Sequence, residues 1–409
     1  MPLLIWGMLY KKKENLPVKE LVDKNAGKFY ELKKILDLSY DDFIRTTEIR
    51  HIQVVQNLWK ACQKDIEKKI YRGLYCVGCE EFYKENELEN GLCPEHKTKP
   101  ELVEEENYFF KLSNYQKKLK KIFDSNEIEI IPGTRRNEVL SFIKSGLEDI
   151  CISRSAKRAQ GWGIDVPGDS SQKIWVWFDA LANYLNSQYW PADVHIIGKG
   201  ILRFHAVYWP AMLLSARLLL PKKIFVHGYL TIGGQKMSKS LGNVIDPFEL
   251  VKKYGTDAVR YFLLREIPST EDGDFTEEKF VERYNADLAG GIGNLVARVV
   301  TLATKSKIQN QKSKINPKLK IQIKKTQNSY TKALEEFKFN ETLIAVWELI
   351  SFCDEYIEKE KPWEGGKNDV IGDLLLTINE MAKLLKPFLP ETSERIIKQE
   401  NKPLFPRLS

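Results

Sequence analysis

The stretch from Lys222 to Glu249 constrains the fold of this chain most strongly, because it carries several local structure signals in a fixed order. Residues 224–226 and 229–232 are rich in β-favouring side chains, and the Gly-Gly pair at 233–234 is typical of a two-residue turn between short strands. The dipeptide Asp246-Pro247 predicts a helix start, since aspartate caps a helix and proline fits its first position. We therefore expect a strand, a tight turn, a loop and a helix in succession.

The loop after the turn reads Lys236-Met237-Ser238-Lys239-Ser240. Two ammonium groups and two hydroxyls on such a loop suit the binding of a triphosphate, because they can neutralise the charge that develops on departing pyrophosphate. The spacing is not that of a P-loop, which needs Gly-x4-Gly-Lys-Ser/Thr. A solvated lysine-rich loop is the alternative, but the ordered pentapeptide within this strand–turn–helix context favours nucleotide chemistry.

The pentapeptide resembles the signature loop of class I aminoacyl-tRNA synthetases, and the residues around it are similar to the methionyl-tRNA synthetase family. The segments 42–47 (Asp-Phe-Ile-Arg-Thr-Thr) and 108–112 (Tyr-Phe-Phe-Lys-Leu) resemble the same family, and the resemblance extends over nearly all of the chain from about Leu16 onward. It implies the ATP-dependent attachment of methionine to tRNA(Met), including the initiator tRNA, through a methionyl-adenylate. The implied cofactors are ATP, Mg²⁺ and Zn²⁺.

The composition is that of an ordinary globular protein with two or three domains: 409 residues, of which 43% are hydrophobic and 29% charged. An excess of 63 basic over 56 acidic side chains gives a net charge of +7, which suits a polyanionic partner without requiring one. Six cysteines, three of them clustered, do not resemble a secreted disulfide framework and favour a cytoplasmic location. The apolar stretch 1–10 precedes its lysines and is too short to span a bilayer, so we expect neither a signal peptide nor a membrane segment.

Strand and helix signals alternate through the first half of the chain, which predicts an α/β domain with a parallel sheet. Residues 16–36 have helical spacing, and Phe43-Ile44 indicates a short strand. Residues 173–178 and 194–197 are also predicted strands, and a long apolar helix is expected at 204–220. Ligands of such sheets bind at the carboxyl ends of the strands, which places the residues that follow these strands near the site.

After Arg283 the strand signals stop, and helices are expected at residues 285–304, 322–337, 340–361 and 371–398. The predicted fold is therefore α/β: a parallel-sheet nucleotide-binding fold, incomplete at its N-terminus, with a zinc-knuckle insert, followed by an all-α helical bundle. The expected domains are a remnant of the first half of the nucleotide-binding fold at 1–65, a zinc-binding connective insert at 66–130, the second half of the fold at 131–225, a signature-loop linker region at 226–281 and an anticodon-binding bundle at 282–409.

Four residues have the spacing of a zinc site: Cys76 and Cys79, then thirteen residues, then Cys93 and His96. Each short turn presents two ligands, and two such turns can complete the tetrahedron that zinc prefers. A hairpin with free thiols is the alternative, and the ligand spacing favours zinc. Such a site keeps no open coordination position, so its role would be structural.

The resemblance implies which residues hold the reactants. Lys236 and Lys239 are the expected catalytic residues, since they would stabilise the departing pyrophosphate. Methionine has a polarizable thioether that favours ring edges, so its pocket should be aromatic and apolar. From the residues alone, Trp177 and Tyr184 would be core aromatics, and His227 could equally be a core histidine. The expected ATP-binding residues are Gly198, Lys199, His227, Gly228, Lys236, Met237, Ser238 and Lys239, and the expected methionine-binding residues are Trp177, Ala180, Leu181, Tyr184, Ile201, His205 and Tyr208. Gly200 stands where the family usually has an acidic residue, which puts the strength of binding in question.

In the helical tail, Asn294 and Arg298 are one turn apart on one face of a predicted helix, and Trp363 follows Pro362. These residues resemble the anticodon readers of the family, with Asn and Arg for base edges and Trp as a stacking platform. From spacing alone, a solvated polar pair and a capping tryptophan are the simpler interpretation.

The five histidines of the chain are His51, His96, His195, His205 and His227, and none has another within four residues. The family uses a His-x-Gly-His turn at the ATP phosphates, early in its fold. We therefore expect a synthetase that lacks its N-terminal strand, turn and helix, through a shortened reading frame or a mis-assigned start, and whose activity alone is in question. We expect a monomer.

Two other functions stay open at this point. The chain could be a non-catalytic tRNA-binding remnant, or one part of a split synthetase, that keeps the bundle. A synthetase for leucine, isoleucine or valine would carry a large editing insert, and no room for one exists between Cys151 and Asp179.

Overall fold

The computed structural model describes residues 16–78, 81–95, 97–237, 244–308, 315–400 and 402–408. The chain forms two compact units. The first comprises the residues up to Glu31 together with Tyr40–Val226, and the second comprises Leu32–Ser39 together with His227–Ser409. Each unit has its own hydrophobic core. Helix α2 (Val18–Ile35) contributes residues to both units.

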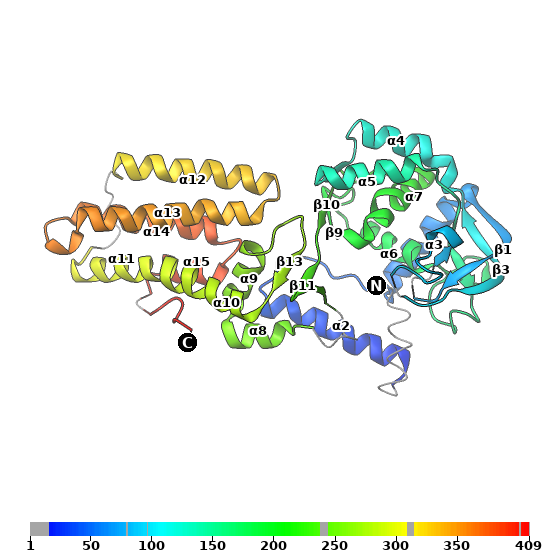
Figure 1. Cartoon of the computed structure of the whole chain (residues 1–409), viewed down its shortest axis with the longest axis horizontal. Coiled ribbons are helices and arrows are strands. Elements are labelled where there is room, and N and C mark those ends of the chain that lie inside the picture. The colour runs from blue at the N-terminus through cyan, green and yellow to red at the C-terminus, as the bar shows by residue number, and fades with distance from the viewer. Residues whose placement is uncertain are drawn as a thin grey trace. The chain divides into compact units, whose positions relative to one another are not determined.

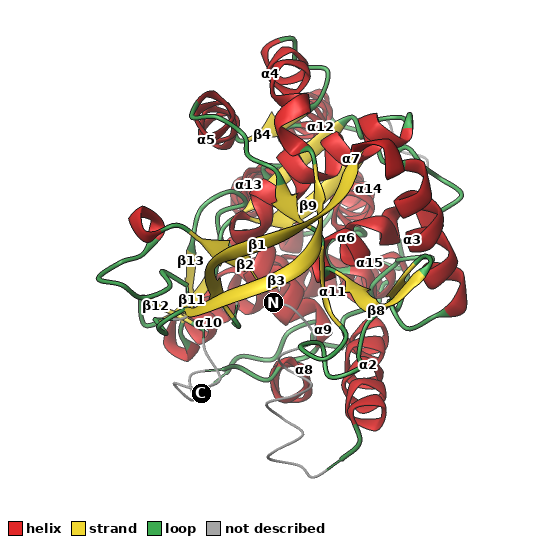
Figure 2. Cartoon of the chain, turned by 90° about the vertical axis from the view of Figure 1, so that its right-hand side faces the viewer, coloured by secondary structure: helices red, strands yellow, loops and turns green. Residues whose placement is uncertain are grey.

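The largest sheet of the first unit is antiparallel, with the strand order β2-β1-β3-β5. Strands β1 (Ile66–Cys76) and β3 (Glu101–Phe110) pair along almost their whole length and form the long ribbon seen in Figure 2. β2 (Glu81–Tyr83) and β5 (Ile150–Cys151) flank them. β1 buries only its last two residues, whereas β3 buries Val103, Phe109 and Phe110, so the ribbon is anchored in the core mainly by the end of β3.

A smaller sheet of the first unit has the order β4-β10-β9. β4 (Glu129–Ile131) pairs in parallel with β10 (Lys223–His227), and β9 (Val194–Gly198) lies on the other side of β10. The predicted combination of helices and sheets is thus confirmed. The largest sheet among the described residues, however, is antiparallel and not parallel as expected. Only residues 77–80 join β1 to β2, and so short a connection requires antiparallel pairing, because a parallel pair needs a long crossover.

Helices surround these strands and supply most of the core of the first unit. α3 (Ile49–Ala61) buries Val55, Leu58 and Trp59 against it. α4 (Gln116–Asp124) and α5 (Gly133–Lys144) lie beside β4 (Figure 2). The largest side chains that are completely buried in this core are those of Phe110, Phe123, Phe178 and Trp209.

Two local predictions in the first unit are wrong. Phe43-Ile44 forms no strand, and the ring of Phe43 instead meets Tyr30 edge-on at 5.7 Å. The strand predicted at 173–178 is β8 (Asp169–Ile174), which is followed by helix α6 (Val176–Leu181). Burial of Phe178 and Leu181 on one side of this helix overrides the β propensity of its residues. β8 pairs with β6 (Ser153–Ser155) and β7 (Asp165–Val166).

The second unit begins with the hairpin predicted around the double glycine. β11 (Leu230–Ile232) and β12 (Gln235–Lys236) are its antiparallel strands, and β13 (Gly273–Phe275) pairs in parallel with β11. The predicted helix start is confirmed: α8 (Pro247–Tyr254) begins after Asp246, whose carboxylate accepts a 2.8 Å hydrogen bond from the Phe248 amide. α9 (Thr256–Arg265) and α10 (Glu277–Arg283) complete this part.

The rest of the second unit is the predicted all-α bundle, whose long helices run side by side in Figure 1. Its last predicted helix is divided between Leu385 and Pro390, because Pro387 and Pro390 cannot donate helical hydrogen bonds. The bundle elements are the π-helical stretch Tyr284–Gly293 (η7), α11 (Asn294–Lys305), α12 (Pro317–Glu335), α13 (Phe339–Glu360), α14 (Asn368–Leu385) and α15 (Pro390–Ile397).

One helical stretch of the described residues, Glu277–Lys305, is long and apolar enough to cross a membrane by length and composition. Its side chains Leu288, Ile292 and Leu295 are completely buried in the bundle core. Arg283, near its start, forms an ion pair with Glu266 at 2.7 Å. This packing is typical of the central helix of a bundle, which is apolar on several sides.

Candidate functional site

An aromatic cluster in the first unit brings together residues predicted to hold methionine. Trp177 on α6 stacks on Phe204, with ring centroids 3.8 Å apart and an angle of 7° between the planes. Phe204 begins a π-helical turn, Phe204–Tyr208. The prediction for residues 204–220 was a regular α-helix. The wider turn places His205 edge-on to Trp177, at 6.5 Å and 79°. α7 (Trp209–Ala216) continues from this turn.

Two hydrogen bonds fix the orientation of His205 in this cluster. The Tyr184 hydroxyl lies 2.9 Å from His205 Nε2, and His205 Nδ1 lies 2.9 Å from the carbonyl oxygen of Ile201. Since a carbonyl only accepts, Nδ1–H donates to Ile201 and Nε2 accepts from the Tyr184 hydroxyl. Burial lowers the pKa of His205 to about 4 and raises the pKa of Tyr184 to about 12, so both groups are neutral at pH 7.

The other predicted methionine residues lie on the same elements. Leu181 and Tyr208 are buried, and Tyr208 meets Phe204 edge-on at 5.5 Å. Ala180 and Ile201 are partly exposed. The predicted ATP residue Gly198 ends β9, and Lys199 follows it, two residues before Ile201. The roles of all these residues in binding stay predictions. Ring contacts and hydrogen bonds connect Trp177, Tyr184, Ile201, His205 and Tyr208 into one group.

His195, for which no role was predicted, contacts Tyr184. His195 is 3% exposed, and its ring centroid lies 4.2 Å from that of Tyr184. The ring centroids of Trp190 and His205 each lie 6.0 Å from that of His195. Burial is again the main cause that lowers the pKa of His195, to about 3. The structure alone shows the alternation along β9, with His195 and Ile197 buried and Ile196 exposed, because Ile196 and Ile197 are both apolar and the sequence has no polar/apolar alternation here.

These two histidines should make the fold sensitive to acid. Their pKa values of about 3 and about 4 lie below the ordinary value of 6.5, so between about pH 4 and 6.5 the unfolded chain binds more protons than the folded chain. We expect their effect on the free energy of unfolding to be absent above pH 7 and to destabilise the fold progressively as the pH falls from 6.5. Urea titrations at several pH values measure this slope. The variants His195→Gln and His205→Gln should flatten it, and equal slopes in all three proteins would contradict this origin.

The signature hairpin, residues 229–236, is held by carboxylates from the β13 segment. Gly233 and Gly234 have φ of +58° and +75°, which a two-residue turn of this kind requires. Asp274 Oδ1 accepts 2.8 Å hydrogen bonds from the Gly234 amide and from the Thr231 hydroxyl. These bonds, the one from Gly234 first, lower the pKa of Asp274. The turn that precedes the signature loop is therefore set by a residue forty positions away.

A close backbone approach occurs at the start of the same hairpin. A Cβ on Gly228 would lie 2.1 Å from the carbonyl oxygen of Glu271, so only glycine fits there. His227, beside it, is exposed, and its Nδ1 lies 2.8 Å from the Gly228 carbonyl oxygen. Met237 is partly buried. The side chain of Lys236, and Ser238 and Lys239 altogether, lie outside the described residues.

The predicted anticodon residues are placed at the bundle surface. Asn294 is exposed on α11, and Trp363 is 50% exposed in the short helix Pro362–Glu364. Arg298 forms ion pairs with Glu358 at 2.6 Å and Asp354 at 3.4 Å. Arg298 therefore needs to exchange acidic partners for a base edge if it reads RNA.

Two of the four predicted zinc ligands are described. Cys76 ends β1 and Cys93 stands in the loop after β2, and both are buried to 1% exposure or less. The Lys97 amide donates to the Cys93 carbonyl oxygen at 2.8 Å, and the Cys93 amide donates to the Thr98 carbonyl oxygen at 2.9 Å. Cys79 and His96 lie outside the described residues, and no group of three His, Cys, Asp or Glu side chains with a metal-binding arrangement occurs among the residues that are described.

Comparison with protein families gives two matches along the chain. The family described as tRNA synthetases class I (M) matches residues 8–99 and 85–300, and the anticodon-binding domain of tRNA ligase matches residues 318–406. The methionine–tRNA ligases of Caldanaerobacter subterraneus and Brucella suis are each 41% identical to the chain, over 95% and 94% of its length. The chain spans 65% of the length of the first relative and 80% of the second.

Solved structures of Mycobacterium tuberculosis methionyl-tRNA synthetase have the same fold. The structure bound by methionyl-adenylate has a TM-score of 0.88 and 36% identity, and the match covers 95% of this chain and 82% of that one. The free form has a TM-score of 0.82 and 34% identity, and covers 93% and 81%. With two family matches that together span most of the sequence, the chain belongs to the methionyl-tRNA synthetases, a family of class I tRNA synthetases.

Proposed function

We propose that this chain activates methionine with ATP and transfers it to tRNA(Met). The observation that carries the proposal is the aromatic cluster of Trp177, Phe204, His205 and Tyr184, with two neutral polar groups that are locked to each other. A thioether is polarizable and favours the edges and faces of aromatic rings, so this cluster suits methionine better than a charged or branched side chain. A structural neighbour of the chain is described as bound by methionyl-adenylate.

The activation step needs no nucleophile from the protein. A carboxylate oxygen of methionine attacks the α-phosphorus of ATP, the bond to the bridging oxygen breaks, and pyrophosphate leaves with the electron pair. Lys236 and Lys239 would stabilise the charge of the leaving group, and Mg²⁺ bound with ATP would neutralise part of it. A ribose hydroxyl of tRNA then attacks the methionyl carbonyl carbon, and AMP leaves. The hairpin geometry set by Asp274 and Gly228 supports the placement of this loop.

We also propose that full activity requires phosphate-binding histidines that this sequence does not contain. None of its five histidines has the His-x-Gly-His spacing that the family uses, and two of the five, His195 and His205, are buried in the aromatic cluster. The second candidate function, a tRNA-binding remnant or one part of a split enzyme, follows from the same observation. Gly200, which removes an expected carboxylate, would weaken substrate binding further.

Methionine-dependent exchange of labelled pyrophosphate into ATP tests both proposals. We expect methionine, but not leucine or isoleucine, to bind to the chain, and we expect exchange to be weak for the chain alone. Adding a polypeptide with the family's His-x-Gly-His segment should raise exchange. Robust exchange by the chain alone would show that the histidine turn is not needed, and selective binding of leucine would overturn the assignment of the substrate.

We also propose a structural zinc ion, tRNA(Met) as partner, and a monomeric, cytoplasmic protein. The buried thiols of Cys76 and Cys93 and the turn at 93–98 fit a structural Zn²⁺ completed by Cys79 and His96. The match of residues 318–406 to an anticodon-binding domain supports tRNA(Met), including the initiator, as partner, and Trp363 lies within that match. Asn294 and Arg298 on α11 precede it, and their role as further readers rests on the family resemblance. A monomer in the cytoplasm stays our prediction, which sedimentation and cell fractionation would check.

A further inference from the structure

A buried histidine on α3 contacts both ends of the segment that carries the aromatic cluster. His51 is completely buried, and its Nε2 lies 2.5 Å from Asp179 Oδ1 on α6. Its other ring nitrogen, Nδ1, lies 3.1 Å from Asn186 Nδ2, at the end of the short helix Ala182–Asn186. The three side chains thus form one connected polar group inside the first unit.

The hydrogen bonds indicate how the ring is oriented. An amide NH₂ only donates, so with Asn186 Nδ2 at Nδ1, that ring nitrogen accepts and Nε2–H donates to the Asp179 carboxylate. Burial raises the pKa of Asp179, and the hydrogen bond from His51 opposes this shift. His51 is therefore the partner that lets Asp179 remain an acceptor where water has little access, since its side chain is only 14% exposed.

The position of these contacts along the chain matters for the pocket. Asp179 stands two residues after Trp177, on the same short helix, and Asn186 stands two residues after Tyr184. Trp177 and Tyr184 supply the ring face and the hydroxyl of the proposed methionine cluster. The His51 imidazole on α3 therefore contacts one side chain two residues after Trp177 and another two residues after Tyr184.

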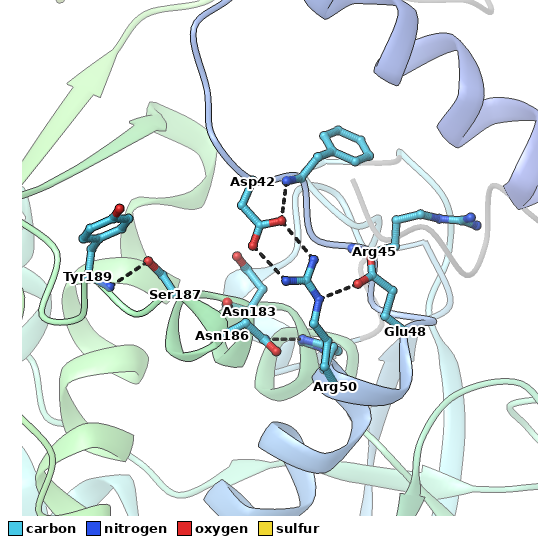
Figure 3. Close-up of polar contacts among 10 residues, drawn as sticks. Asp42, Arg45, Glu48, Arg50, Asn183, Asn186, Ser187 and Tyr189 are labelled. Atoms are coloured by element: carbon cyan, nitrogen blue, oxygen red, sulfur yellow. Dashed lines mark hydrogen bonds and ion pairs between the residues drawn. The ribbon is translucent and has the colours of Figure 1, made fainter.

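The start of α3, where His51 lies, is itself fixed by charged side chains, as Figure 3 shows. The Arg50 guanidinium binds the Asp42 carboxylate through two 2.9 Å hydrogen bonds and Glu48 Oε2 at 2.5 Å. Glu48 also accepts from the Arg45 amide at 2.9 Å. Asn183 and Asn186 lie beside this network in Figure 3. The first turn of α3, which contains His51, is thus connected to the preceding residues by ion pairs and hydrogen bonds.

We propose that His51 is a positioning residue for methionine, which sets the affinity of the aromatic cluster by holding Asp179 and Asn186. This inference rests on the proposed function. It differs from a role in packing alone, because the position of one hydrogen-bond donor, and not the volume of the side chain, determines whether α6 is held.

The test compares His51→Gln with His51→Asn. The amide nitrogen of glutamine reaches the place of Nε2 and can donate to Asp179, whereas asparagine reaches only the place of Nδ1. Both variants remove the ring, and asparagine also lacks one methylene of glutamine, so the melting temperature is needed to separate lost packing from the lost hydrogen bond. Methionine affinity is measured on the full chain by the change in tryptophan fluorescence, together with the melting temperature and the affinity for ATP.

We expect His51→Gln, which keeps the bond to Asp179 and loses the contact with Asn186, to bind methionine severalfold more weakly than the unaltered chain. His51→Asn, which loses the bond to Asp179, should bind on the order of tenfold more weakly or worse, since small displacements of positioning groups are costly. Affinity for ATP should be the same in both. Asn186→Ala, which releases only the second contact, should weaken methionine binding severalfold and decides the question if His51→Asn does not fold.

Three results would overturn the inference in different ways. If the unaltered chain binds methionine and both His51 variants, or Asn186→Ala, bind it equally well, His51 has no positioning role. If His51→Gln and His51→Asn lose affinity and melting temperature in parallel, the role is one of packing. If the unaltered chain shows no saturable binding of methionine, the proposed function fails, and this inference fails with it.

Discussion

Replacing Gly228 with alanine is expected to lower the free energy of unfolding of the second unit by about 1–3 kcal/mol and to reduce pyrophosphate exchange more than methionine binding. The added Cβ would lie 2.1 Å from the Glu271 carbonyl oxygen and 2.5 Å from the Asp272 amide nitrogen. Both are backbone atoms, so the contact cannot be relieved by a side-chain rotation. The hairpin must move away from β13, and the signature loop moves with it.

Gly27→Ala provides the matched control for this substitution. Gly27 lies within α2, and nothing is within 4 Å of a Cβ built there. Alanine favours a helix over glycine by about 0.5–1 kcal/mol, so Gly27→Ala should stabilise the chain slightly. Denaturant titration and exchange assays of the two variants make the comparison. An unchanged exchange rate in Gly228→Ala would show that the approach of β11 to β13 does not position the loop.

Removal of the proposed zinc is expected to have the second large effect. Cys93→Ala should abolish bound zinc, one ion per chain, and unfold the ribbon around β1 and β2, because binding of structural zinc supplies about 10–16 kcal/mol in small zinc modules. The end of the ribbon that carries Cys76 buries only Tyr75 and Cys76 on β1 and Val103 on β3, so little else would hold this end. Zinc content by atomic absorption and amide hydrogen exchange across residues 66–110 measure the outcome.

Cys353→Ala is the control for the loss of a buried thiol. Cys353 is completely buried in the bundle core of the second unit, far in sequence from the proposed ligands. We expect its substitution to leave the zinc content at one per chain while reducing stability modestly, as core truncations do. Equal zinc content in Cys93→Ala and Cys353→Ala would contradict the proposed ligand set.

Several features of this protein follow from local sequence signals. The double glycine at 233–234 predicts a turn that requires positive φ, and Asp246-Pro247 predicts the start of α8; both are confirmed. The helices of the bundle are confirmed because their apolar residues recur at a helical period over long segments. Local signals fail where burial outweighs propensity: residues 176–178 belong to the strand predicted at 173–178 but begin α6, and Phe43-Ile44 forms no strand.

The sequence by itself thus determined the helical tail, the signature hairpin and the family, because each depends on residues close together in the chain or on an ordered motif. Only the tertiary structure decided what surrounds them. His51 and Asp179 are 128 positions apart in the chain, and Asp274 and Gly234 are 40 apart, so no local sequence pattern predicts either contact. The physical reason is that these polar contacts form where separate helices and strands pack, and their partners are chosen by that packing.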